Sequence, residues 1–399
     1  MIAISPADVH SLKGAADKSE LVSLLSDLIA IESVNPLIPH GGSGEAEVIR
    51  YIAGYFERLK VPFRLEEVFP GRNNLIALLE GETRHGICFE SHTDTVSAEN
   101  MTIEPFNPLL RDGRLYGRGA CDDKGSLACM MVAVKLLKQN NLRPATDMYF
   151  VAAIDEEDNY RGVAKLLENG LKVSAAVAGE PTGMNVGCAC KGTLRFDMVA
   201  KGKAGHSSRP HEGRNAIVDM ANVVAALQRE LPRRFEANRH PLLGTATFSV
   251  GRIQGGTLVN IIPDECRIQI DRRTLPGDDF EIVREEMLAV VRTLQANDPA
   301  LNVTVEPAWV TDYPMDTPTD ATVVQTAAVA CETILGHSNV YGVAFGCDAS
   351  KFARIGVDAI VMGPGDIQKA HSADEFIPVD ELAPASEVYA ELALRYKPY

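Results

Sequence analysis

The sequence predicts an α/β protein with a largely parallel sheet flanked by helices, interrupted by a smaller α+β domain. Towards both ends of the chain, short apolar runs bounded by polar or glycine residues alternate with segments of helical periodicity. This alternation is typical of buried parallel strands joined by helices. From about 192 to 306, strand-like and helical segments instead follow the order βαββαβ, which is the order of a ferredoxin-like domain.

The elements of the larger domain are predicted from the spacing of apolar residues. Helical spacing in 21–29, 48–59 and 127–137 indicates three helices. Short apolar runs indicate buried strands at 75–79, 87–89, 148–154, 175–178 and 359–362. We therefore expect this domain to comprise residues 1–191 and 307–399, so that both ends of the chain contribute to it.

The middle of the chain contains the elements of the smaller domain, 192–306. Strands are predicted at 194–199, 245–250, 267–271 and 301–305, and helices at 215–231 and 280–295. The segment 231–243 is rich in proline, arginine and histidine, and we expect a loop or helix end with a solvated basic face there. The chain is long enough for two domains of ordinary size.

Composition excludes several classes of protein. The 399 residues include 39 Lys and Arg against 54 Asp and Glu, a net charge of −15. This balance argues against nucleic-acid and anionic-membrane partners, both of which attract basic surfaces. Neither a membrane span nor a signal peptide is visible, and eight cysteines are too few for a disulfide scaffold. We expect a cytoplasmic protein with reduced thiols.

Five clusters of polar residues follow predicted strands or begin a predicted helix. They are His92 with Asp94, the glycine-rich 117–125 with Asp122, Asp155–Glu157, Glu180, and Gly363–Gly365 followed by His371. Each has a simpler interpretation alone, as a strand-end turn, a helix cap or an acidic surface turn. The glycine-rich segment lacks both the third glycine of a dinucleotide-binding loop and the Gly-Lys-Ser/Thr of a P-loop.

Together the clusters point to a metal site. Ligand sites in open parallel sheets form beyond the carboxyl ends of the strands, where most of these residues are predicted to lie. Two imidazoles and several carboxylates without a cysteine favour zinc, cobalt or manganese. Five candidate ligands, one of them able to bridge, indicate a pair of metal ions.

The same motifs resemble, in their order and over nearly the whole chain, the M20 family of zinc-dependent amidohydrolases and exopeptidases. The closest similarity is to its acetylornithine deacetylase and succinyl-diaminopimelate desuccinylase branch. Within that branch, the segment 363–367 leading to Ala370 and His371 is most similar to the deacetylases.

The resemblance implies two Zn²⁺ ions per subunit, with Co²⁺ or Mn²⁺ as substitutes. Their ligands would be His92, Asp122, Glu157, Glu180 and His371. Asp122 would bridge the two ions; Glu157 and His371 would complete one of them and Glu180 the other. Asp94 would orient His92, and Glu156 would be the general acid/base for the bridging water.

The inserted domain resembles the family's lid and dimerisation domain. The motifs 205–208 and 213–217 carry this similarity, and His206 would reach the active site of a partner subunit in a homodimer. Asn260 and Arg273 would bind the substrate carboxylate, together with the backbone of Gly363 and Gly365. Arg273 suits that task because its planar guanidinium can bind both carboxylate oxygens.

Three positions near the expected site depart from the family's usual residues. Asp123 follows Asp122 where Met or Asn is common, Cys347 stands where Thr or Ser is commoner, and 158–161 lacks the usual small residues. None of the departures removes a ligand. They bear more on which substrate the chain binds than on whether it is active.

The predicted activity is hydrolysis of the amide bond of small N-acyl amino acids by a metal-bridging hydroxide. A dipeptidase, a carboxypeptidase or an N-succinyl amino acid desuccinylase with the same metals is the nearest alternative. A cysteine hydrolase using Cys121 or Cys347 with His371 is a weaker one. A metal- or peptide-binding module without catalysis is a further alternative from a different class.

Overall fold

A computed structural model describes residues 12–398, and the chain divides into two compact units. The first unit holds the described residues up to Cys188, Thr317–Tyr341 and the residues from Cys347 onward; the second holds Ala189–Asp316 and Gly342–Gly346. The second unit is therefore mainly an insertion into the first. The predicted smaller domain, 192–306, lies within it.

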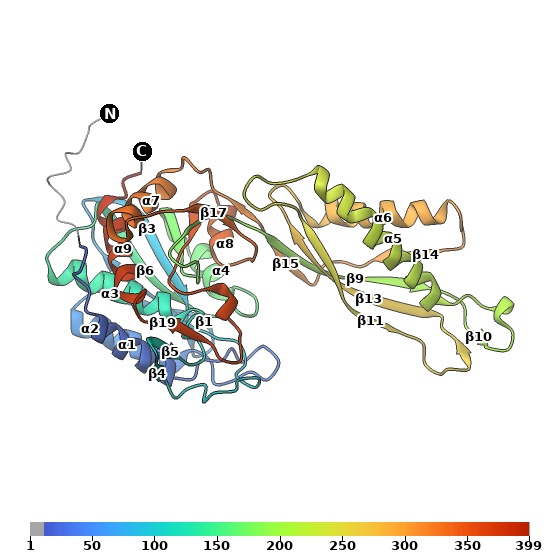
Figure 1. Cartoon of the computed structure of the whole chain (residues 1–399), viewed down its shortest axis with the longest axis horizontal. Helices are drawn as coiled ribbons and strands as arrows, with labels where there is room; N and C mark the ends of the chain where they lie inside the picture. The colour runs from blue at the N-terminus through green and yellow to red at the C-terminus, as the bar shows by residue number, and fades with distance from the viewer. Residues whose placement is uncertain (1–11, 399) are drawn as a thin grey trace. The chain divides into compact units, whose positions relative to one another are not determined.

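A nine-stranded sheet, most of whose strands belong to the first unit, has the order β1-β2-β6-β3-β7-β18-β8-β16, with β17 also beside β8. Its strands are β1 (Phe63–Phe69), β2 (Arg72–Leu79), β3 (Thr83–His92), β6 (Thr146–Ala153), β7 (Val173–Ala178), β8 (Val186–Cys190), β16 (Met315–Asp316), β17 (Val340–Val343) and β18 (Asp358–Val361). Strands β1, β3, β6 and β17 of this sheet are labelled in Figure 1. The central strands β6, β3, β7 and β18 are parallel, whereas β1, β2, β8 and β16 pair antiparallel. The prediction of an α/β fold with a largely parallel central sheet is confirmed.

Continuous apolar runs mark the central strands because both faces of the sheet are covered. In β3 every residue from Gly86 to His92 is buried, and in β7 Ala175–Ala178 are buried as well. Strands buried on both faces need apolar residues at successive positions rather than at alternate ones.

The helices of the first unit cover this sheet. They are α1 (Lys18–Ala30), α2 (Ala46–Leu59), α3 (Lys124–Gln139), α4 (Arg161–Glu168), α7 (Thr322–Leu335), α8 (Ala349–Arg354) and α9 (Leu382–Arg395). Helix α3 packs against β3 and β6 and also contacts α1 and α9. Enclosed in this way, it buries an unbroken run from Lys124 to Val134. Helices α4 and α8 contact each other, and α8 also packs on β7 and β18.

A small sheet that the sequence does not predict brings together two distant segments. Its strands are β4 (Leu109–Arg111), β5 (Arg114–Tyr116) and β19 (Phe376–Pro378), in the order β19-β5-β4. Phe376 pairs with Tyr116, and the two rings lie 5.1 Å apart. This pairing places the segment after His371 beside the segment that leads to Asp122.

The second unit has an antiparallel sheet in the order β11-β13-β9-β14, with β15 also on β9. Its main elements are β9 (Gly192–Lys201), α5 (Ala216–Ala237), β11 (Thr247–Gly255), β13 (Glu265–Thr274), α6 (Phe280–Gln295), β14 (Asn302–Val305) and β15 (Val310–Asp312). Buried residues alternate along β13, and its buried face packs with α5 and α6 into a separate core. A short pair, β10 (Gly205–His206) and β12 (Ile261–Ile262), and the 3-10 turn Pro210–Glu212 complete the unit.

The segment 231–243 contains a helix end, as expected, since α5 ends at Ala237 and the basic side chains of Arg233 and Arg234 are exposed. The helix itself runs further than the predicted 215–231, because it continues through Pro232. Leu231 and Phe235 are buried in the core of the second unit. Packing of these apolar side chains offsets the hydrogen bond that proline removes from a helix interior.

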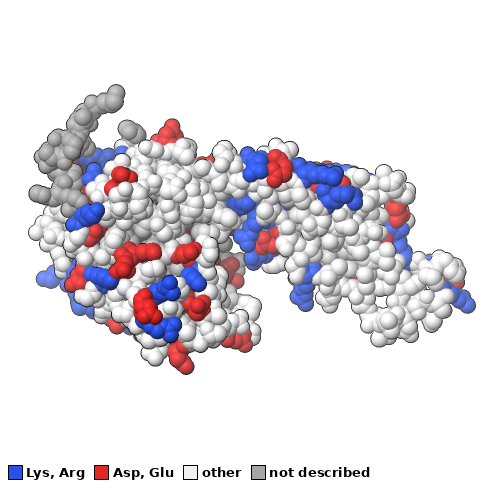
Figure 2. Space-filling view, viewed as in Figure 1, with Lys and Arg blue, Asp and Glu red and all other residues white. Residues whose placement is uncertain are grey.

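Charged side chains are interspersed over the face shown in Figure 2, with acidic and basic groups close to one another on both units. Such mixing is typical of a solvated surface. Within residues 12–398, none of the helices combines the length and the apolar character needed to cross a bilayer.

Candidate metal centre

The predicted site residues of the first unit follow the carboxyl ends of its parallel strands. His92 is the last residue of β3, Glu156 and Glu157 follow β6, and Glu180 follows β7. Because parallel strands end at the same edge of a sheet, the fold gathers these side chains there. Asp122 comes from the turn before α3, joined to the next residue by a cis peptide bond.

Two imidazoles and two carboxylates form a continuous chain of contacts. His92 Nε2 lies 3.0 Å from Asp122 Oδ1, and His371 Nε2 lies 3.1 Å from Asp122 Oδ2. The same His371 nitrogen is 3.1 Å from Glu157 Oε1. Donor atoms of His92, Asp122 and Glu157 all lie within 4.8 Å of one another. The structure thus brings four of the five predicted ligands together through direct contacts.

The orientation of Asp122 fits a bridging carboxylate. Each of its oxygens faces a different imidazole, and its side chain is 8% exposed. A carboxylate that bridges two cations must direct its oxygens in this divergent way. Imidazole and carboxylate donors also match the preferences of Zn²⁺, Co²⁺ and Mn²⁺.

The carboxylates around the two imidazoles favour the charged forms of both histidines. Burial opposes a charge on His92, but hydrogen bonds to Asp122 and Asp94 outweigh it and raise its pKa well above the ordinary value. Burial is likewise outweighed at His371, where Asp122 and Glu157 raise the pKa to about 11. The two imidazoles in turn hold the pKa of Asp122 below its usual range, against the effect of burial.

Two further predicted residues, Glu156 and Glu180, add carboxyl groups to the site. Burial raises the pKa of Glu180 well above its ordinary value, and the charges of Asp122 and Glu156 add to this effect. Burial and the charge of Glu157 also raise the pKa of Glu156, whereas the charge of His92 lowers it. Carboxylates collected at a site away from water are costly without a counter-charge, so the donor set fits divalent cations.

Asp94 is fixed between the histidine and the segment after β6. Its carboxylate accepts hydrogen bonds from the backbone N–H groups of Glu156 (3.1 Å) and Glu157 (3.0 Å). His92 Nδ1 lies 3.0 Å from the Asp94 carbonyl oxygen and 3.6 Å from its carboxylate. Asp94 therefore couples the orientation of His92 to the positions of Glu156 and Glu157, as groups behind a metal ligand commonly do.

Two buried residues of this site were not predicted from the sequence. Asn35 donates its side-chain N–H to Asp94 Oδ2 (2.7 Å) and Asp155 Oδ1 (3.1 Å). Glu375 accepts hydrogen bonds from the loop that carries Asp122. Both are fully buried, but no local pattern marks a lone Asn or Glu as buried. The one available signal for Glu375 was its position four residues after His371.

Gly363 and Gly365 lie directly after β18, and both have internal partners. Gly363 N–H donates to Thr182 Oγ1 (3.1 Å), and Gly365 N–H donates to Glu381 Oε2 (2.7 Å). Gly363 is also closely enclosed, since a Cβ there would lie 2.3 Å from Ser126 Oγ. The structure thus gives these glycines a packing role, and their contact with substrate stays a prediction.

The remaining predicted residues belong to the second unit and are described within it. His206 is exposed on β10, with its Nδ1 2.7 Å from Ser208 Oγ, and Asn260 is exposed beside β12. Arg273 at the end of β13 donates to Asp271 Oδ1 and Thr193 Oγ1, both at 2.9 Å. Their role towards a substrate stays a prediction.

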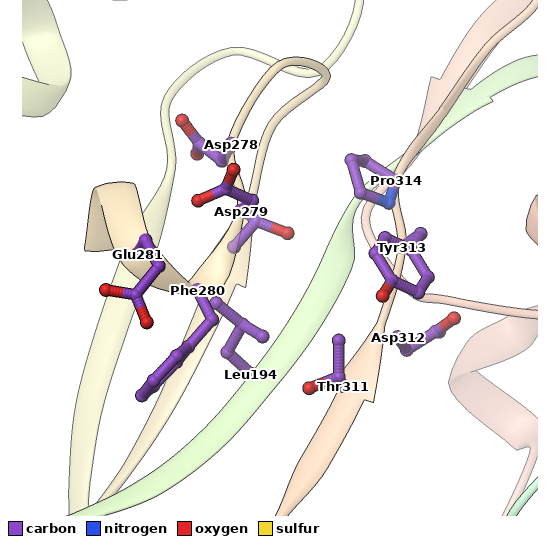
Figure 3. A pocket seen from close by; sticks show the side chains of 10 residues that line it. Leu194, Asp278, Asp279, Phe280, Glu281, Thr311, Asp312, Tyr313 and Pro314 are labelled. Carbon is purple, nitrogen blue, oxygen red and sulfur yellow. The ribbon is translucent and has the colours of Figure 1, made fainter. Parts of the chain in front are cut away.

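The second unit also contains a separate acidic pocket of about 280 Å³. Figure 3 shows carboxylates of Asp278, Asp279 and Glu281 near the start of α6, with Thr311, Asp312 and Tyr313 across from them. None of the predicted site residues lines this pocket.

Comparisons with known proteins agree with this architecture. Acetylornithine deacetylase of Myxococcus xanthus is 30% identical over 385 residues, 94% of this chain and 97% of the relative. A probable succinyl-diaminopimelate desuccinylase of Staphylococcus epidermidis is 28% identical, over 95% and 98% of the two chains. The solved structure of Bacillus subtilis YXEP, described as a dinuclear metal binding peptidase, matches with a TM-score of 0.72 at 20% identity, over 95% and 99%.

The family model described as peptidase family M20/M25/M40 matches residues 88–395. This range includes nearly all of the polar groups just described, from His92 to Glu375. Its relatives include deacetylases, desuccinylases and peptidases, all of which cleave amide bonds. The chain belongs to the M20/M25/M40 peptidase family and is a metallohydrolase that acts on amide bonds.

Proposed function

We propose that this chain removes the acyl group from small N-acyl amino acids, with acetyl as the preferred group. The observation that carries the proposal is the contact chain His92–Asp122–His371–Glu157, in which Glu157 directly follows Glu156. The 30% identity to a deacetylase over nearly the full length of both chains supports the acetyl group.

Two divalent cations, in our proposal Zn²⁺, would be held by five residues. Asp122 would bridge them, His371 and Glu157 would hold one, and His92 and Glu180 the other. When bound, such cations lower the pKa of a water ligand towards about 7 and thereby supply a nucleophile at neutral pH. Asp94 would keep His92 in the orientation that directs its Nε2 towards the cations.

Glu156 would move the proton during hydrolysis. Its pKa is raised by burial and by neighbouring carboxylates, and a general acid/base must be able to hold a proton between the two transfers. It would accept a proton from the attacking water and deliver it to the departing amine nitrogen. Because Glu156 is no proposed ligand, its loss should stop the chemistry and leave the cations in place.

The second unit would supply the carboxylate-binding groups and the subunit contact. Arg273 and Asn260 would hold the α-carboxylate of the substrate, and His206 of a partner subunit would stabilise the developing oxyanion. The edge strand β11 is largely exposed, and Ile253, Leu258 and Val259 near it are exposed apolar residues. Both features support a homodimer through this unit.

All eight cysteines are buried free thiols, which supports the further proposal of a cytoplasmic location.

A substrate panel tests the activity. N-acetyl amino acids, N-succinyl amino acids and dipeptides are compared at equal concentration with Zn²⁺-loaded protein, and we expect the largest kcat/KM for an N-acetyl amino acid. A larger kcat/KM for an N-succinyl amino acid or a dipeptide would contradict the proposal and identify the chain as a desuccinylase or a dipeptidase.

The variant Glu156→Gln tests the catalytic assignment. We expect kcat to fall by about 10²–10⁴-fold, the usual contribution of a general acid/base, with bound metal unchanged. Glu168→Gln, which alters an exposed carboxylate at the end of α4, is the matched control and should keep full activity. Wild-type activity in Glu156→Gln would remove Glu156 from the mechanism.

A further inference from the structure

Glu375 is a fully buried carboxylate that accepts four hydrogen bonds from one loop. Its Oε1 accepts from the backbone N–H groups of Cys121 (2.9 Å) and Asp122 (3.0 Å). Its Oε2 accepts from Gly119 N–H (3.0 Å) and from Arg118 Nη1 (2.7 Å). All four donors lie within five successive residues, the last of which is Asp122.

The shape of the loop depends on this carboxylate. Gly119 has φ +81°, and a Cβ there would lie 2.9 Å from Thr95 Cγ2. The loop therefore curls around Glu375 and directs several N–H groups inward to a single anion, as in backbone nests that bind anions. Buried N–H groups left without an acceptor would cost stability, so the carboxylate and the loop conformation depend on each other.

The same segment also carries His371. Glu375 follows His371 by four residues, its backbone carbonyl accepts a hydrogen bond from Gly117 N–H (3.1 Å), and the next residue pairs with Tyr116 in the small sheet. Glu375 thus bonds to the Asp122 loop through both its side chain and its backbone. His371 in turn reaches Asp122 Oδ2 at 3.1 Å.

We propose that Glu375 is a positioning residue that sets the Asp122 carboxylate relative to His371, so that the two can hold metal ions together. This inference rests on the metal site of the proposed function. The hydrogen bonds of the Glu375 side chain go to Arg118 and to backbone N–H groups, so Glu375 acts through the backbone of Asp122 and through its own connection to His371. The competing interpretation is a counter-charge for buried Arg118 alone, which would affect stability but not the metal.

Two variants separate these interpretations. In Glu375→Gln the carboxamide has one oxygen and one NH₂ group, so in either orientation the NH₂ faces two N–H donors. Glu375→Asp keeps the charge, but its side chain is one methylene shorter and should not satisfy all four donors where they now lie. Both variants should disturb the loop that carries Asp122, and the aspartate variant decides the question if the glutamine variant does not fold.

Glu391→Gln is the matched control. Glu391 is also a fully buried glutamate paired with an arginine, since its Oε1 accepts from Arg395 Nε at 2.7 Å. Both residues belong to α9, and neither bonds to the metal-site segments. This control reproduces the loss of a buried charge pair without touching the Asp122 loop.

The measurement is the Zn²⁺ affinity of each full-length protein by competition with a chromophoric chelator, together with the visible spectrum of bound Co²⁺. We expect about 10- to 100-fold weaker Zn²⁺ binding in both Glu375 variants, the typical effect of losing a partner behind a ligand, and a changed Co²⁺ spectrum. Glu391→Gln should bind Zn²⁺ like the wild type. Wild-type affinity and an unchanged spectrum in a folded Glu375 variant would overturn the inference.

Failure of the proposed function has a different signature. If the wild type binds metal but cleaves none of the panel substrates, the substrate assignment fails while the comparison of affinities still tests Glu375. If the wild type binds no Zn²⁺, both the metal site and the role of Glu375 are refuted.

Discussion

At the scale of single residues, Asp122 is the centre of the site because both of its oxygens face an imidazole. In the metal-free chain the two histidines stabilise the folded state only while they carry a proton. Burial is outweighed by Asp122 and Glu157 at His371, whose pKa is raised to about 11 from an ordinary value near 6.5. A base whose pKa is raised by folding binds its proton more tightly in the folded state.

This shift predicts how the stability of the metal-free protein changes with pH. The stabilisation by protonated His371 is complete below about pH 6.5 and is lost as the pH rises towards the folded-state pKa. We therefore expect the Tm of chelator-treated protein to fall between pH 6.5 and 9. His371→Gln should weaken this trend, and Zn²⁺ should abolish it because the cation takes the place of the proton. A Tm that rises over this range in metal-free wild type would contradict the arrangement of His371 and Asp122.

At the scale of elements, the strand ends decide which residues meet. The strand that ends at Val361 leads into Gly363, which packs directly on Ser126 at the start of α3 and on the backbone of Glu180. The close approach of these three segments fixes where Glu180 lies. Any side chain at Gly363 must push one of them aside.

Gly363→Ala should therefore be destabilising. The new Cβ would lie 2.3 Å from Ser126 Oγ and 2.6 Å from the Glu180 carbonyl oxygen. Overpacking of this kind costs about 1–3 kcal/mol, measurable by urea unfolding, and displacement of Glu180 should also weaken metal binding. Gly251→Ala, where a Cβ would have no neighbour within 4 Å, should change stability by less than about 0.5 kcal/mol. Equal effects of the two substitutions would contradict the close packing around Gly363.

Local sequence patterns predicted much of this arrangement because the central strands are continuous apolar runs with polar residues directly after them. His92, Glu156, Glu157 and Glu180 were placed by that pattern alone. The contacts of Asn35 and Glu375 are between residues far apart in the chain, and neither side chain differs locally from a surface residue. The continuation of α5 through Pro232 was missed for a related reason, since tertiary packing outweighs local preference there.

At the scale of the whole molecule, each of the two units has its own core. The ligands proposed for the metals all lie in the first unit, whereas the core of the second is formed by α5, α6 and its antiparallel sheet. A cation that binds the folded first unit stabilises that unit by mass action. The second unit has none of the proposed ligands.

Zn²⁺ should therefore protect the two units unequally. At about 100 times its Kd, the ion should stabilise the first unit by about 2.7 kcal/mol and slow amide hydrogen exchange in β3 and α3, with β13 unchanged. Equal protection of β3 and β13 by Zn²⁺ would show that the units open together.

A substitution in the second unit tests the same independence from the other side. Asp279→Ala, which removes the side-chain cap at Ile282 N–H of α6, should cost about 1 kcal/mol and speed amide hydrogen exchange in α6 only.

The dependence of amide hydrolysis on bound metal tests the account of the site most directly. Metal-free protein is prepared with a chelator, Zn²⁺ is added back in steps, and hydrolysis of an N-acetyl amino acid is measured at each step. We expect no hydrolysis without metal and a rise to a plateau at two equivalents of Zn²⁺ per chain. Full activity in the metal-free protein, or a plateau at a single equivalent, would contradict a site in which Asp122 bridges two ions.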